Sequence, residues 1–257
     1  MPKVSGVLLD LSGVVFSGDD AIAGSLAAID DLRSHNIPLC FVTNTTSAPL
    51  RGLLEKLQAI GVAASREDIF TPAVAACRLV KERGLTPHLL VHPNLLEDFD
   101  APAAGTPDAV IVGDAGAAFT FEALNEAFRA IDGGAEFIAL ACNRTFRDGK
   151  GDLSLDAGPF VKALEFATRR EALLVGKPAT AFYADAVAHL GTPPAETVMI
   201  GDDVESDVEG ALQAGLRGLL VRTGKYRQGD EGLIDPPPSA VVADLREGVD
   251  WILAGGR

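Results

Sequence analysis

The sequence predicts an α/β fold: a mostly parallel sheet with helices on both faces, and a second, smaller α/β unit inserted into the chain. Apolar segments of strand length alternate with segments of helical periodicity along the 257 residues. The first apolar run, Val7–Leu9, is nearly continuous rather than alternating, which is typical of a strand buried on both faces. Hydrophobic residues make up 47% of the chain, enough for a buried core.

The first third of the chain begins the larger unit. Leucines and isoleucines at helical spacing follow each of the first two strands. Pro49 and Pro72 lie in first helical turns, where a missing N–H costs nothing, and Gly61 and Gly84 end the two helices. In order, we expect a strand over 7–10, a helix over 21–36, a strand over 38–42, a helix over 50–60 and a helix over 72–84.

The middle of the chain, residues 85–171, differs in style and predicts the smaller α/β unit. Loops rich in glycine, proline and aspartate, such as 100–107, surround its apolar segments. We expect strands over 89–91, 109–112 and 137–140 and a helix over 121–131. The larger unit then consists of residues 1–84 and 172–257.

The last third returns to the first style and completes the larger sheet. Each of its apolar runs ends in glycine or a polar residue. The expected elements are strands over 173–175, 197–200 and 219–221 and helices over 179–190 and 245–253.

Charge and cysteine usage limit the partners and the compartment. The formal net charge is −14, which repels phosphate backbones and anionic lipids, so neither nucleic acid nor a membrane is an expected partner. Three widely spaced cysteines (Cys40, Cys77 and Cys142) form neither a disulfide framework nor a zinc pattern. Together with the lack of a signal-peptide pattern, this favours a cytoplasmic location. A homodimer is left open.

Polar residues follow four of the predicted strands. Because the carboxyl ends of parallel strands share one edge of a sheet, we expect these residues to lie close together. They are Asp10 with Ser12, Thr43 with Asn44, Lys177, and Asp202 with Asp203 and Asp207.

This set contains what phosphoryl transfer to a carboxylate requires. A carboxylate nucleophile forms an aspartyl phosphate, but it must approach an anionic phosphoryl group, so nearby cations have to neutralise the charge. Mg²⁺ prefers one or two carboxylates together with water and substrate oxygens, and Asp10 and Asp202 could supply the two carboxylates. Lys177 could neutralise the remaining charge. Thr43 and the main chain of Asn44 could donate hydrogen bonds to phosphate oxygens.

The four motifs occur in an order that resembles the haloacid dehalogenase superfamily of phosphohydrolases, with the α/β cap of class IIA inserted in a Rossmann-like core. The resemblance implies that Asp10 is the nucleophile, that Thr43 and Asn44 bind phosphate and that Lys177 stabilises charge. It also implies Mg²⁺ held by Asp10, the Ser12 main-chain carbonyl and Asp202, with Asp203 and Asp207 orienting water or ligands around it. The matching segments are Asp10–Val15, Val42–Asn44, Val175–Pro178 and Gly201–Asp207.

Ser12 departs from the pattern of most phosphatases of this superfamily, which carry a second aspartate there as general acid and base. A serine hydroxyl cannot act as a general acid or base near neutral pH, and an alkoxide leaving group needs that acid because the pKa of its conjugate acid lies far above neutral pH, close to that of water. Imidazole, amine and phosphate leaving groups, with pKa values of about 6.5, 10.4 and 6, need it less. Ser12 therefore points to P–N bonds or pyrophosphate as substrates. The Asp-x-Ser-Gly pattern, Gly224–Arg227 and Pro236–Pro238 are similar to the phospholysine phosphohistidine inorganic pyrophosphate phosphatase group.

Other functions stay open beside a phosphatase acting on a small phosphorylated substrate or phosphoamino acid. A phosphate-binding regulatory protein would keep the site and lose catalysis, and a phosphomonoesterase of the same superfamily would use it on small esters. A dehalogenase would leave the Asp202–Asp207 cluster without a task, and no dinucleotide or Walker A loop is present. In the smaller unit, Asn143 and Arg144 follow a strand, and Arg144 could meet a second phosphate or carboxylate, although a solvated loop arginine explains it equally well.

Overall fold

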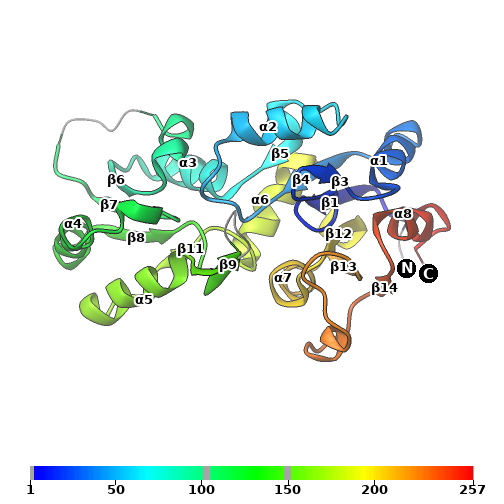
Figure 1. The fold of residues 1–257 in the computed structure, drawn as a ribbon. Coiled ribbons are helices and arrows are strands. Elements are labelled where there is room, and N and C mark those ends of the chain that lie inside the picture. The colour runs from blue at the N-terminus through cyan, green and yellow to red at the C-terminus, as the bar shows by residue number, and fades with distance from the viewer. Residues whose placement is uncertain (1–2, 101–104, 148–151, 257) are drawn as a thin grey trace. The chain divides into compact units, whose positions relative to one another are not determined.

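The computed structural model describes residues 3–100, 105–147 and 152–256 and divides the chain into two compact units (Figure 1). The first unit runs up to Thr43 and adds Leu53–Phe70 and the chain from Lys177 onward. The second consists of Asn44–Gly52 and Thr71–Gly176. Each unit has its own parallel sheet, which confirms the predicted α/β class.

The first unit is built on a six-stranded sheet in the order β14-β13-β12-β1-β4-β5, and every neighbouring pair in it is parallel. All five residues of β1 and of β12 are buried, as expected for central strands covered on both faces. Leu9 pairs with Ile200 of β12, and Asp10 pairs with Val42 of β4. The strands are β1 (Gly6–Asp10), β4 (Leu39–Val42), β5 (Ile69–Phe70), β12 (Thr197–Gly201), β13 (Arg217–Val221) and β14 (Ala240–Val242).

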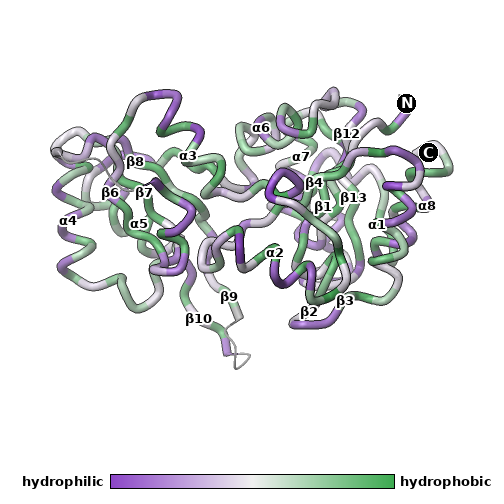
Figure 2. Tube along the Cα trace, turned by 90° about the horizontal axis from the view of Figure 1, so that it is seen from above, coloured by the Kyte–Doolittle hydropathy of each residue, from purple (hydrophilic) through white to green (hydrophobic). Residues whose placement is uncertain are grey.

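Helices cover both faces of this sheet. Helix α1 (Ser25–Ser34) contacts α8 (Leu245–Leu253), and α6 (Thr180–Leu190) contacts α7 (Gly210–Gln213). Figure 2 shows the hydrophobic strands between these two pairs. In a right-handed β-α-β connection, the direction in which the chain moves along the sheet decides which face the helix covers. The chain moves in opposite directions from β1 to β4 and from β12 to β13, so α1 and α7 are expected on opposite faces.

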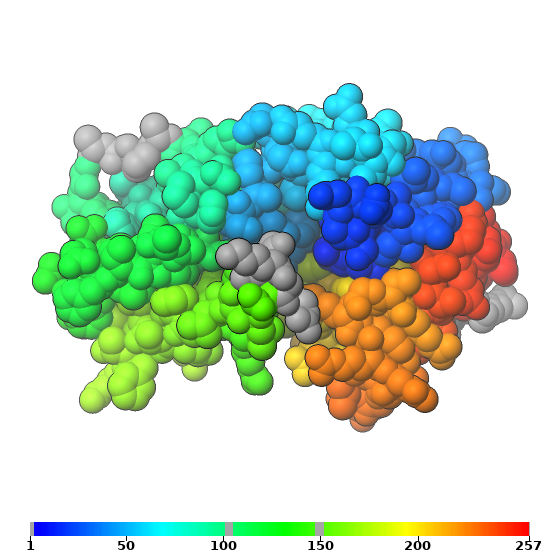
Figure 3. Space-filling model, viewed as in Figure 1, coloured from blue at the N-terminus to red at the C-terminus, as the bar shows by residue number. Residues whose placement is uncertain are grey.

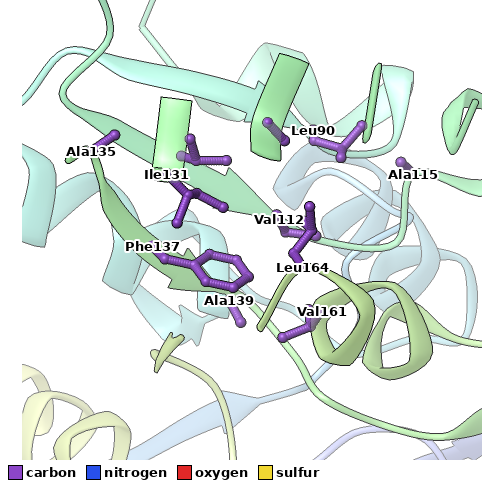
Figure 4. Packing of buried hydrophobic residues seen from close by; sticks show 11 residues of the cluster. Leu90, Val112, Ala115, Ile131, Ala135, Phe137, Ala139, Val161 and Leu164 are labelled. Carbon is purple, nitrogen blue, oxygen red and sulfur yellow. The ribbon is translucent and has the colours of Figure 1, made fainter. Parts of the chain in front are cut away.

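The second unit has a four-stranded parallel sheet in the order β11-β8-β7-β6. Its core gathers side chains of β7 and β8 with Ile131 of α4 and Val161 and Leu164 of α5 (Figure 4). An antiparallel hairpin, β9–β10, precedes α5. The elements are α3 (Pro72–Arg83), β6 (Pro87–Leu90), β7 (Ala109–Val112), α4 (Phe121–Asp132), β8 (Glu136–Ala139), β9 (Thr145–Arg147), β10 (Leu153–Leu155), α5 (Ala157–Thr168) and β11 (Leu173–Leu174).

Several predicted elements have the boundaries that their capping residues indicated. Thr71 caps α3 by accepting from the Val74 amide at 3.2 Å, and Gly84 ends it in a left-handed conformation with φ of 67°. Helix α2 (Leu50–Ala59) ends two residues before Gly61, which has φ of 93°.

Two predictions were wrong. The helix expected over 21–36 begins only at Ser25, because Asp20–Ala21 forms strand β3, which pairs with β2 (Phe16–Ser17) in a short hairpin. The strand expected over 173–175 does not belong to the larger sheet: β11 pairs with β8 in the second unit. Its apolar composition fits either sheet, and only the partner strand decides between them. The chain therefore returns to the first unit at Lys177.

The boundaries at residues 84/85 and 171/172, and a cap role for the inserted unit, stay predictions. The contact-defined second unit also contains α3 and β11. Cys40, Cys77 and Cys142 lie in the described part of the chain and form no disulfide. Among the described residues, no helix has both the length and the apolar character needed to cross a membrane.

Candidate active site

The candidate site begins where two neighbouring strands of the larger sheet end. Asp10 is the last residue of β1, and Asp202 directly follows β12. Because Leu9 and Ile200 are paired in parallel register, the two aspartates emerge side by side at the same edge. Thr43 follows β4, the strand on the other side of β1, and it is also buried. The sequence predicted four strand ends at one edge of this sheet; the structure places three of them there, and the strand before Lys177 belongs to the other sheet.

Lys177 lies between two carboxylates. Its Nζ atom is 2.5 Å from Asp10 Oδ1 and 2.6 Å from Asp207 Oδ1. All three side chains are buried, and that of Lys177 is only 3% exposed. Burying a charge costs free energy unless the charge is paired, so these two ion pairs offset the desolvation of all three side chains. Lys177 reaches this place from the loop that opens α6, not from a strand of the larger sheet.

A π-helical turn, Val204–Glu209, positions Asp207. Its Val204 and Val208 pack with Leu220 and Ile234 in a small hydrophobic cluster. The buried Tyr183 hydroxyl donates to two carbonyl oxygens of this turn, those of Ser206 at 2.5 Å and Asp207 at 3.1 Å. The Asp203 amide donates to Asp207 Oδ2 at 3.1 Å. Packing and hydrogen bonds therefore aim the Asp207 carboxylate at Lys177.

Two glycines make room for Asp202. A Cβ atom on Gly13 would lie 2.1 Å from Asp202 Oδ2, and one on Gly224 would lie 1.9 Å from it, so neither position has space for a side chain. Gly13 also has φ of +86°, a conformation that favours glycine. The Lys225 amide donates to Asp202 Oδ2 at 2.7 Å. These contacts fix one carboxylate oxygen of Asp202.

Asp203 is held beside this cluster. Its Oδ1 accepts from the Ser206 amide at 3.0 Å, and its Oδ2 pairs with Lys225 Nζ at 3.1 Å. Burial works against ionisation, but Lys225 and the Ser206 amide outweigh it and lower the pKa of Asp203 below its usual value.

Burial dominates the electrostatics of the two strand-end aspartates. It raises the pKa of Asp10 to about 6, although Lys177 opposes the shift. It raises the pKa of Asp202 to about 7, with Asp10 and Asp207 adding to the shift. Burial alone would lower the pKa of Lys177, but Asp10 and Asp207 raise it above its usual value. The site therefore holds more negative charge than its lysine neutralises.

The donor set fits a hard divalent cation. Carboxylate oxygens of Asp10, Asp202 and Asp207 all lie within 4.8 Å of one another. Oxygen donors at this spacing are the groups that such a cation would stabilise, and burial and neighbouring carboxylates raise the pKa values of two of them, Asp10 and Asp202. Ser12, two residues past Asp10, is exposed and belongs to the tight turn in which the Gly13 amide donates to Phe16 O at 2.7 Å.

Three predicted residues belong to the second unit. Asn44 directly follows Thr43 and is half-buried. Asn143 is half-buried and its carbonyl accepts from the Gly158 amide at 2.9 Å. Arg144 is exposed, and its carbonyl accepts from the Asp156 amide at 3.2 Å. Their predicted roles in substrate binding stay predictions.

Sequence reasoning missed two groups that shape the site, Tyr183 and Lys225. Tyr183 looked like an ordinary core residue of a helix, and nothing local indicates that its hydroxyl supports a distant turn. Lys225 was visible in principle, because it lies four residues past the end of β13, at the same edge of the sheet.

Comparison with known proteins identifies the family. The profile described as haloacid dehalogenase-like hydrolase matches residues 7–101, and one described as HAD-hydrolase-like matches residues 174–248. These two stretches contain Asp10, Thr43, Lys177 and Asp202 of the candidate site. The chain belongs to the haloacid dehalogenase-like hydrolase family, and it is a phosphatase.

The similarity to known proteins extends over nearly the whole chain. Haloacid dehalogenase-like hydrolase domain-containing protein 2 from Bos taurus is 42% identical over 250 residues, covering 97% of this chain and 96% of the relative. Phospholysine phosphohistidine inorganic pyrophosphate phosphatase from Mus musculus is 41% identical over 256 residues, covering 97% and 94%. A glycerol phosphate phosphatase from Mycobacterium tuberculosis, crystallised in complex with magnesium, is 29% identical with a TM-score of 0.84, covering 95% and 76%.

Proposed function

We propose that this phosphatase transfers the phosphoryl group of its substrate to Asp10 and then to water. The observation that carries the proposal is the Asp10 carboxylate itself: it is buried at the end of β1, paired with Lys177 and adjacent to Asp202. A carboxylate so placed is held in one orientation by its neighbours, which is what an in-line attack on phosphorus requires.

The proposed reaction has two steps. An oxygen of Asp10 forms a bond to phosphorus while the bond from phosphorus to the leaving group breaks, and the leaving group takes the electron pair. Water then attacks the aspartyl phosphate, which releases inorganic phosphate and restores the carboxylate. Lys177 balances negative charge on Asp10 and on the phosphoryl oxygens during both steps, and Thr43 would donate a hydrogen bond to one of these oxygens.

We further propose that the site works with Mg²⁺. Asp10, Asp202 and the Ser12 main-chain carbonyl would hold the ion, and Asp203 and Asp207 would orient these ligands or water around it. When bound, the cation neutralises charge on the phosphoryl group. The magnesium complex of the M. tuberculosis relative and the three clustered carboxylates support this assignment.

The residue at position 12 limits the leaving groups in this proposal. Ser12 offers no carboxylic acid that could protonate a departing alkoxide near neutral pH. The favoured substrates are therefore P–N compounds and inorganic pyrophosphate, whose leaving groups are weaker bases. The name of the 41% identical mouse relative, a phospholysine phosphohistidine inorganic pyrophosphate phosphatase, supports the same substrate classes.

Replacing Ser12 with Asp tests this argument. We expect Ser12→Asp to raise kcat/KM for an ordinary phosphomonoester by roughly 10²-fold relative to pyrophosphate, because the new carboxylic acid can protonate the alkoxide. Ser12→Asn is the matched control, since it has the same shape and no acidic proton. Steady-state kinetics on both substrates measure the ratio. An unchanged ratio in Ser12→Asp would refute the leaving-group argument.

The proposed cation also predicts a pH dependence. Without a cation, the raised pKa values of Asp10 and Asp202 mean that the folded state binds protons more tightly than the unfolded chain does. Stability from these two groups is therefore fully present below about pH 4 and is lost as the pH rises to about 7. Mg²⁺ binds the ionised carboxylates, so it should raise the Tm strongly at about pH 8 and weakly at about pH 5.5. Equal Tm shifts at both pH values, measured by calorimetry, would contradict the assignment.

The second unit is proposed to act as a cap that selects the substrate. Arg144 is exposed and directly precedes β9 of the β9–β10 hairpin. Its guanidinium would bind a phosphate or carboxylate group of a small phosphorylated compound or phosphoamino acid. We also propose a cytoplasmic location, which is consistent with three cysteines that form no disulfide within the described part of the chain.

A further inference from the structure

The loop after β13 lies directly against the candidate site. Thr223 Oγ1 donates to Gly13 O at 2.5 Å, and the Lys225 amide donates to Asp202 Oδ2 at 2.7 Å. A Cβ atom on Gly224 would lie 2.7 Å from the Gly13 Cα, so the two backbones are in close contact. In Figure 3 the orange segment that includes this loop lies at the surface beside the blue N-terminal segment. Lys225 is therefore anchored to the site through its own backbone.

The side chain of Lys225 marks the solvent-facing side of the charged cluster. Lys177 is 3% exposed and lies between Asp10 and Asp207, whereas the side chain of Lys225 is 68% exposed and pairs with Asp203. The inner lysine is enclosed by protein carboxylates, and the outer one is accessible to a ligand.

We infer that Lys225 binds the leaving group of an anionic substrate, and that it thereby favours a phosphoanhydride such as inorganic pyrophosphate over a P–N compound. This inference rests on the proposed function and narrows its two proposed substrate classes to phosphoanhydrides. An in-line attack by buried Asp10 sends the leaving group away from Asp10, toward solvent, and Lys225 supplies a cation on the solvent side.

The chemistry of the two leaving groups explains the preference. When Asp10 attacks pyrophosphate, the bond between phosphorus and the bridging oxygen breaks, and the oxygen keeps the electron pair. The departing phosphate, with a pKa of about 6, leaves as an anion without needing a proton from Ser12. An ammonium ion in charge-assisted contact stabilises it as the charge develops. When Asp10 attacks a P–N compound, the bond between phosphorus and nitrogen breaks, the nitrogen keeps the electron pair and it takes a proton from water. The amine therefore departs neutral or cationic, and Lys225 gives it no attraction.

Lys225→Met tests the inference, because methionine keeps the length of the stem and removes the charge. We expect kcat/KM for pyrophosphate to fall at least about tenfold relative to kcat/KM for phosphoramidate, whose leaving group is ammonia. Arg227→Met removes a charge from an exposed residue of the same loop and should leave the ratio unchanged. An equal fall on both substrates in Lys225→Met would assign the Lys225 side chain only to its ion pair with Asp203 and overturn the inference.

A binding measurement separates this inference from the proposed function. In an Asp10→Asn background, adding Lys225→Met should weaken the binding of methylenediphosphonate at least about tenfold and leave that of inorganic phosphate nearly unchanged, as measured by calorimetry with Mg²⁺ present. If the wild-type protein hydrolyses neither pyrophosphate nor phosphoramidate, the proposed function fails, while the binding comparison still decides the role of Lys225. Equal affinities for methylenediphosphonate with and without the substitution would overturn it.

Discussion

Asp10→Asn is expected to lower kcat by at least roughly 10⁴-fold on every substrate, because an amide is not a nucleophile that can form and release a phosphoryl intermediate. The fold should survive: asparagine has nearly the same volume, and Lys177 keeps its 2.6 Å contact with Asp207. Replacing a carboxyl group whose pKa burial has raised to about 6 removes a desolvation cost, which offsets the lost ion pair. Phosphate-release assays together with thermal unfolding measure both effects.

The matched control is Asp30→Asn, which changes an exposed aspartate on α1. It removes the same unit of negative charge from the protein and should keep wild-type turnover. This result would show that the loss of turnover in Asp10→Asn does not come from the change in net charge. Retention of more than a few per cent of turnover in Asp10→Asn, with no conversion of the asparagine back to aspartate by mass spectrometry, would refute Asp10 as the nucleophile.

Lys177→Met is expected to produce the second largest effect, on both activity and stability. It leaves Asp10 and Asp207 buried without their shared cation, and breaking a buried pair from one side costs about 3–5 kcal/mol. The pKa of Asp10 should rise further, because the opposing charge is gone. We expect turnover to fall by roughly 10³-fold, since neither the nucleophile nor the phosphoryl oxygens are neutralised.

Urea unfolding of Lys177→Met at two pH values tests the physical cause. At about pH 8, Asp10 must either stay ionised without a cation or hold a proton at a free-energy cost, so the loss of stability should be large. At about pH 5, protonation of Asp10 removes its charge beside Asp207, and the loss of stability should be smaller. Lys162→Met, which removes an exposed lysine paired with Glu165 on α5, should change stability by less than about 1 kcal/mol at either pH. A pH-independent loss in Lys177→Met would show that packing, not charge, explains it.

The sequence predicted the positions of those site residues that lie at the ends of neighbouring strands in one sheet. A continuous apolar run that stops at an aspartate is a local pattern, and it placed Asp10 and Asp202 at one edge because parallel strands share their carboxyl ends. The helix caps of α3, Thr71 and Gly84, are equally local and were predicted correctly. Local patterns of this kind carry their physical cause within a few residues.

What the sequence did not predict depends on partners far along the chain. The strand before Lys177 joins β8 rather than the larger sheet, and its two apolar residues fit either one. The short strands β2 and β3 have too few residues to show a period, so the helical pattern was extended across Ala21. Tyr183 supports the turn that carries Asp207, a contact between residues 24 positions apart that no spacing rule indicates.

The most direct test of Asp10 as nucleophile is to capture its phosphoryl adduct. Wild-type protein is mixed with Mg²⁺ and pyrophosphate, quenched in acid within the first turnover, and digested for mass spectrometry, with Asp10→Asn treated in parallel. The mechanism predicts a phosphoryl group on the peptide that contains Asp10, absent from the Asp10→Asn sample and lost as turnover ends. Turnover without an adduct on that peptide, or with the adduct on another residue, would contradict it.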